Sequence, residues 1–205
     1  IRHGHISTLH IWWARRPLAA CRAVICAALW PDPADPNCPQ AFRDAAAEAM
    51  HEHAVNAQTV KEVIEVTGAN YAVWQQLTKK ANRLDPQDAD HQRTIRNLLL
   101  DFIADFANWD ASTVPCFLAT ARKLTQAAHE ALGGAPGTRP LVVDPFAGGG
   151  SIPLEALRVG ADAFASDLNP VPVLLNKVVL EYIPKFGQRL ADEVRKWGEW
   201  IKREA

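Results

Sequence analysis

The chain has 205 residues, of which 48% are hydrophobic and 22% charged, and its net charge is −1. This composition is typical of a globular protein that is long enough to bury a core. No stretch offers the roughly 18 uninterrupted apolar residues of a membrane span and no signal peptide is visible, so we expect a cytoplasmic protein without a membrane partner.

The first thirty residues are basic, although the chain as a whole is nearly neutral. They contain four arginines and no acidic residue. Two interpretations stay open: the arginines lie on a solvated helix face, or they face phosphates or a carboxylate. The four cysteines form no C-x-x-C pair and the histidines form no H-E-x-x-H, so we expect no metal site in this chain.

Apolar periodicity predicts a mostly helical stretch up to residue 132. A first helix follows Pro17, and Gly133-Gly134 ends the last one, which begins at Ser112 or Thr113. The helices between them are expected at 41–55, 60–66, 71–80 and 94–106. Four aromatic residues are expected in the core: Trp74, Phe102, Phe106 and Trp109.

From residue 140 the pattern changes to strands alternating with helices. A strand over 141–143 leads into a glycine-rich turn and a helix that Ser151 caps. The buried side of that helix is expected to carry Leu154, Ala156 and Leu157. A second strand over 163–166 ends at Asp167, and helices are expected over 172–182 and 188–203.

The glycine-rich turn reads Asp144-Pro145-Phe146-Ala147-Gly148-Gly149-Gly150-Ser151. It is not a dinucleotide fingerprint, because Pro153 stands where the third glycine belongs, and no Gly-Lys-Ser/Thr follows as in a P-loop. It resembles the first motif of S-adenosylmethionine-dependent amino-methyltransferases. That resemblance implies that the turn holds the methionyl part of the cofactor and that Asp167 binds the ribose hydroxyls. The expected cofactor-binding residues are Asp144, Pro145, Phe146, Gly148, Gly150, Ser151, Asp167, Leu168 and Asn169.

The segment Trp12-Trp13-Ala14-Arg15-Arg16-Pro17-Leu18 resembles the helix start that precedes the glycine turn in many DNA amino-methyltransferases. In that family the segment closes over the methionine end of the cofactor. The resemblance therefore adds Thr8, Trp12, Arg16 and Pro17 to the expected cofactor-binding residues.

Together with the run from Arg2 to Pro17, these motifs make the chain similar to the N-terminal part of the zinc-ribbon-containing adenine-specific DNA methylases. The resemblance implies an α/β, Rossmann-like S-adenosylmethionine methyltransferase fold with an incomplete sheet and a large α-helical insertion. Residues 1–31 would be the cofactor-closing segment and helix, 32–139 the insertion, and 140–205 the start of a methyltransferase domain that continues beyond residue 205.

The implied activity is methyl transfer from S-adenosylmethionine to the N6 amine of adenine in DNA. Some such enzymes serve restriction-type or anti-phage defence, so DNA and defence-system proteins are the expected partners. The Asn/Asp-Pro-Pro-Tyr/Phe motif of the flipped-base site is absent, as are the zinc-ribbon cysteines. We therefore expect no catalytic residue within this chain, and no activity from the chain alone. An RNA guanine-N2 methyltransferase and a non-catalytic methyltransferase-fold subunit are the alternatives.

Overall fold

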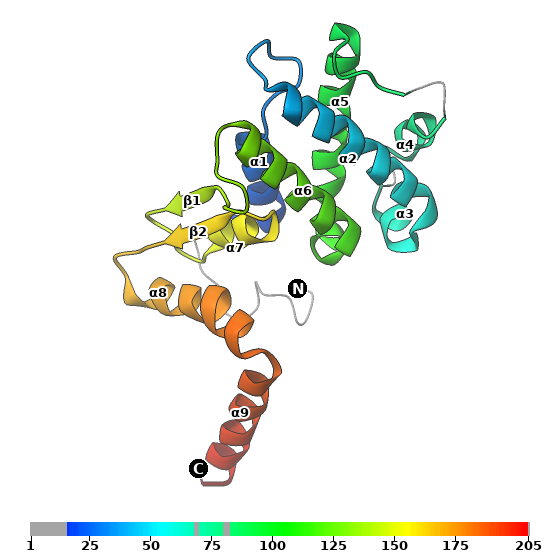
Figure 1. The fold of residues 1–205 in the computed structure, drawn as a ribbon. Coiled ribbons are helices and arrows are strands. Elements are labelled where there is room, and N and C mark those ends of the chain that lie inside the picture. The colour runs from blue at the N-terminus through cyan, green and yellow to red at the C-terminus, as the bar shows by residue number, and fades with distance from the viewer. Residues whose placement is uncertain (1–15, 68–69, 80–82, 205) are drawn as a thin grey trace.

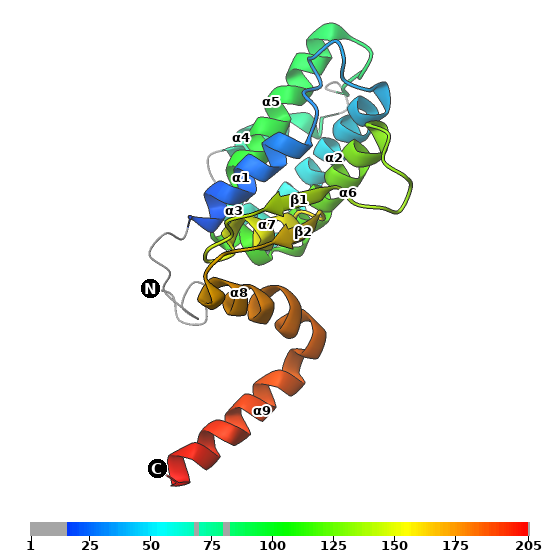
Figure 2. The same ribbon diagram turned by 90° about the vertical axis from the view of Figure 1, so that its left-hand side faces the viewer.

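The computed structural model describes residues 16–67, 70–79 and 83–204. Most of these residues are helical (Figures 1 and 2). The first part of the chain forms α1 (Leu18–Leu29), α2 (Gln40–Thr59), α3 (Lys61–Thr67), α4 (Tyr71–Leu77), α5 (Ala89–Phe106), the short 3-10 helix η4 (Asp110–Thr113) and α6 (Pro115–Ala131). The second part forms β1 (Leu141–Asp144), α7 (Ser151–Arg158), β2 (Asp162–Ala165), α8 (Pro170–Asn176), the π-helix η5 (Lys177–Tyr182) and α9 (Ile183–Glu204).

Helix α2 is the centre of the helical part, because α3, α4, α5 and α6 all pack against it (Figure 1). Helix α5 begins five residues earlier than the periodicity predicts, since the Asp88 side chain accepts hydrogen bonds from the backbone N–H groups of Asp90 and His91. The predicted core aromatics Trp74, Phe102 and Phe106 are buried. The prediction for Trp109 is wrong: its side chain is 42% exposed, beside the short helix η4.

The predicted α/β, Rossmann-like fold is wrong for the residues described. The sheet consists of two short parallel strands, and the register places Leu141 opposite Asp162 and Asp144 opposite Ala165. Helix α7 packs on both strands. Among the described residues after Asp167 the chain forms helices and no further strand. The described sheet is therefore too small to form the central layer of a Rossmann-like fold. The β-turn-α unit that the glycine motif predicts is present, but it is attached to a helical body.

Helix α1 connects the two parts of the molecule. It packs against α5 and α6 on one side and against α7 on the other (Figure 2). Cys21 and Cys26 are buried in this helix as free thiols. Residues more than a hundred positions apart in the sequence are thereby held side by side.

The C-terminal segment leaves this body. After α8 and η5 the backbone bends at Gly187, whose φ of 51° and ψ of −133° are not helical, and α9 projects away from the other elements (Figure 1). None of the residues of α9 is buried. Among the described residues, none of the helices has the length and apolar character needed to cross a membrane.

Candidate functional site

The glycine turn joins the end of β1 to the start of α7. Asp144 Oδ1 accepts a hydrogen bond from the Phe146 N–H at 3.2 Å, and the Ala147 N–H donates to Ser166 O at 2.9 Å. Gly148 and Gly150 have φ angles of 48° and 73°, in the left-handed region that glycine adopts without steric cost. The turn is therefore tied to the ends of both strands.

Asp167 follows β2 and binds the glycine turn directly. Its Oδ2 accepts the Gly148 N–H and its Oδ1 accepts the Asn169 N–H, both at 2.9 Å. The N–H groups of Asn169 and then Gly148 lower the pKa of this carboxyl, so it is ionised near neutral pH. Because a carboxylate oxygen can accept more than one hydrogen bond, ribose hydroxyls could still bind there. The sequence did not reveal that Asp167 also holds the turn.

Asn176, at the end of α8, is a second support that the sequence did not reveal. Its Nδ2 donates to Gly148 O at 3.1 Å and to Pro172 O at 2.8 Å. Its Oδ1 is buried without a hydrogen-bond partner and lies against Gly150, where an added Cβ would collide with it. An asparagine within a helix has no sequence signature for this role.

The start of α1 lies at the same turn. Ser151 Oγ donates to Arg16 O at 2.9 Å, so residues 16 and 17 sit beside the N-terminus of α7. The predicted capping role of Ser151 is wrong, because Gly150 occupies the N-cap position and Ser151 is the first residue of the helix. Thr8 and Trp12 lie outside the described residues.

A buried ion pair fixes α1 against α7. Arg22 Nε lies 2.7 Å from Glu155 Oε2, and both side chains are 0% exposed. Arg22 Nη1 also donates to the carbonyl of Phe106, the last residue of α5, and to that of Asn108, which follows the helix. Arg22 thus faces a carboxylate of the protein itself, and the solvated-face interpretation of this arginine is wrong. The buried side of α7 also differs from the prediction. Leu154 and Leu157 were expected there but are only partly buried, whereas Glu155, which was not expected, is fully buried.

Most of the predicted cofactor-binding residues come together at the end of the two strands. Asp144, Gly148 and Asp167 lie within one hydrogen-bonded cluster, which Asn169 extends. Pro145 joins it through its carbonyl, which accepts Ser166 Oγ at 3.1 Å. The side chains of Phe146 and Leu168 stand in solvent, with exposed fractions of 77% and 94%.

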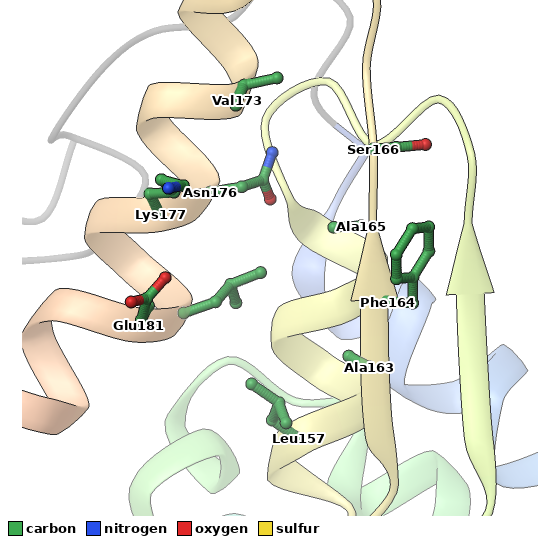
Figure 3. A pocket seen from close by; sticks show the side chains of 10 residues that line it. Leu157, Ala163, Phe164, Ala165, Ser166, Val173, Asn176, Lys177 and Glu181 are labelled. Carbon is green, nitrogen blue, oxygen red and sulfur yellow. The ribbon is translucent and has the colours of Figure 1, made fainter.

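A pocket of about 390 Å³ lies next to this cluster, between β2 and the α8–η5 segment (Figure 3). Ser166 and Asn176 line it, but the glycines of the turn and Asp167 do not. Asn176 and Ser166 therefore border both the pocket and the glycine turn.

Residues 1–59 match a family described as a protein of unknown function, DUF1156. No curated protein and no solved structure matches the chain. The match covers α1 and α2 and does not reach the glycine turn.

Proposed function

We propose that the chain carries the S-adenosylmethionine half-site of a methyltransferase that acts on the N6 amine of adenine in DNA. The observation that carries the proposal is the meeting of three distant segments at one point: Arg16, the turn from Gly148 to Ser151, and Asp167. The proposal rests on this local arrangement and on the sequence motifs, and it does not require a complete α/β sheet.

Each part of the cluster has a matching part of the cofactor. Gly148 and Gly150 leave the turn without a Cβ, so the methionyl chain can lie against the backbone. The ionised Asp167 can accept hydrogen bonds from both ribose hydroxyls. Residues 16 and 17, beside Ser151, would cover the methionine end.

The remaining steps of the reaction are assigned outside these residues. The Asn/Asp-Pro-Pro-Tyr/Phe motif that would hold the flipped adenine is absent from the sequence, so we expect this chain to bind the cofactor without methylating DNA. We place the protein in the cytoplasm, with DNA and defence-system proteins as its partners.

Calorimetry with S-adenosylmethionine tests the proposal. Asp167→Ala removes both ribose acceptors, and we expect about tenfold weaker binding or more. Asp162→Ala is the matched control, since Asp162 is an exposed acid at the opposite end of β2. If the unaltered chain does not bind, or if both variants bind equally well, the assignment of Asp167 fails.

A further inference from the structure

The side chain of Asn176, the last residue of α8, reaches both of the turn glycines that have a left-handed backbone. Its Nδ2 donates a hydrogen bond to Gly148 O at 3.1 Å, and its Oδ1 fills the place that a Cβ on Gly150 would take. Figure 3 shows the side chain pointing away from α8, toward the turn. One side chain therefore holds the two residues on which the shape of the turn depends.

The orientation of the Asn176 amide is fixed by its hydrogen bonds. Nδ2 also donates to Pro172 O at 2.8 Å, so both of its hydrogens are used. Turning the amide over would place Oδ1 against two carbonyl oxygens. Oδ1 therefore stays toward Gly150, buried without a hydrogen-bond partner, while the Gly150 N–H donates to Ala147 O at 2.8 Å.

An asparagine at this place costs the fold free energy. A buried acceptor without a partner is unfavourable, and a leucine of similar size would avoid that cost. Local rules broken in this way are expected at functional sites. The π-helix η5 begins at the next residue, Lys177, and π-helical turns are frequent at functional sites as well. Both observations indicate a role for Asn176 beyond the packing of α8.

Asp167 and Asn176 hold Gly148 from its two ends. Asp167 Oδ2 accepts the Gly148 N–H, and Asn176 Nδ2 donates to the Gly148 carbonyl. Together they fix the backbone angles of Gly148 and the surface that the turn presents. In the proposed half-site Asp167 also binds the ribose, whereas Asn176 contacts the turn through Gly148 and Gly150, the glycines against which the methionyl chain lies.

We propose that Asn176 is a positioning residue for the amino-acid end of S-adenosylmethionine. It acts through Gly148 and Gly150, whose backbone it fixes, and not by contact with the cofactor. The inference rests on the proposed function, since it needs this ligand at the turn. Loss of the Asn176 amide should weaken the binding of the amino-acid part and leave the binding of adenine and ribose unchanged. A general loss of folding would weaken both.

A pair of ligands separates these two parts of the cofactor. S-adenosylhomocysteine and methylthioadenosine share the adenine, the ribose and a thioether sulfur, but only the former carries the amino-acid chain. Calorimetry on the 205-residue chain gives the ratio of their affinities. Asn176→Leu keeps the volume and removes the donor, so we expect this ratio to fall about tenfold while methylthioadenosine binds as before. Lys177→Leu makes the same change at the next, exposed residue and should leave the ratio unchanged.

A measurement on the unaltered chain does not depend on the folding of a variant. Both protons of the Asn176 side-chain amide are hydrogen-bonded, so they should exchange slowly and can be followed by nuclear magnetic resonance. S-adenosylhomocysteine should shift their signals, because its amino-acid chain meets the glycines that the amide holds. Methylthioadenosine should leave them in place.

Failure of the positioning role can be told apart from failure of the cofactor site. If the unaltered chain binds both ligands, but Asn176→Leu weakens them equally or not at all, the positioning role is wrong and the cofactor site stands. Equal shifts of the amide signals with the two ligands, or no shift with either, lead to the same conclusion. If the unaltered chain binds neither ligand, the proposed cofactor site fails and the positioning role fails with it.

Discussion

At the residue scale, the ion pair between Arg22 and Glu155 decides how α1 sits on α7. Burying two charges costs about as much free energy as their attraction returns, so such a pair adds little net stability. Its effect lies in orientation, because Arg22 reaches the carbonyls of Phe106 and Asn108 as well as the Glu155 carboxylate. One side chain therefore aligns α1, α7 and the end of α5.

Removing Glu155 should be costly, because it leaves the Arg22 guanidinium buried with carbonyl partners only. We expect Glu155→Leu to lower the free energy of unfolding by about 3–5 kcal/mol. The double variant Arg22→Met, Glu155→Leu removes both charges and should regain most of that loss. Urea denaturation measures both effects.

The control for this experiment is the exposed pair of Lys61 and Glu65 on α3. Glu65→Ala should change the free energy of unfolding by less than about 1 kcal/mol. If the double variant is no more stable than Glu155→Leu, the unpaired buried charge is not the cause of the loss.

Part of this site could be read from single residues of the sequence, and part could not. The glycine turn and Asp167 are visible because their residue types and order are specific. Arg22 is the only charged residue in Leu18–Leu29, and an isolated charge in an apolar helix indicates a buried partner. The identity of that partner depends on packing across 133 positions, which no local pattern reports. The supporting role of Asn176 is equally non-local.

At the element scale, the positions of the helices and strands were easier to predict than the fold in which they are arranged. The helices α2 to α6 follow from apolar spacing and from breakers such as Gly133-Gly134. Both strands were found to within one or two residues. The number of strands in the sheet could not be predicted, because the motif reports one β-turn-α unit and says nothing of how many strands pair around it. The Rossmann-like prediction failed at that step.

The contact between the glycine turn and Asn176 can be tested by a substitution at Gly150. Gly150→Ala places a Cβ against Asn176 Oδ1 at a residue whose φ is +73°. We expect a loss of about 1–2 kcal/mol in unfolding free energy from the left-handed backbone, and about 1–3 kcal/mol more from the collision. Chemical denaturation of the variant measures the sum.

Gly137→Ala separates the two causes. Gly137 has a φ of +78°, but an added Cβ there meets nothing within 4 Å. This variant should show only the backbone cost. Equal losses at the two positions would mean that Asn176 does not press on the turn.

At the scale of the whole molecule, the helical core contains two buried titratable groups with opposite pH dependence. His53 is surrounded by Trp74, Phe102 and Phe117, and burial lowers its pKa to about 4. Asp105 accepts hydrogen bonds from Trp74 Nε1 and Asn70 Nδ2, and burial raises its pKa to about 6. The two groups share Trp74 as a neighbour.

Their contributions to stability work against each other. An unfolded histidine takes up its proton near pH 6.5 but buried His53 only near pH 4, so stability is lost as the pH falls through this window. The unfolded Asp105 carboxyl titrates near pH 3.8 and the folded one near pH 6, so stability is gained as the pH falls from about 6 to 4. Each effect amounts to about 3 kcal/mol, and the sum is a nearly flat profile.

His53→Leu should expose the contribution of Asp105. Without the histidine, the free energy of unfolding should rise by about 2 kcal/mol between pH 6 and pH 4, relative to the change in the unaltered chain, because part of the full linkage lies outside this interval. Urea denaturation at a series of pH values measures the difference. His51→Leu is the matched control, because His51 lies exposed on the same helix. A His53→Leu profile parallel to that of the unaltered chain would show that His53 does not remain neutral in the folded core. For these two groups taken together, the opposite contributions leave little net pH dependence between about pH 6 and pH 4.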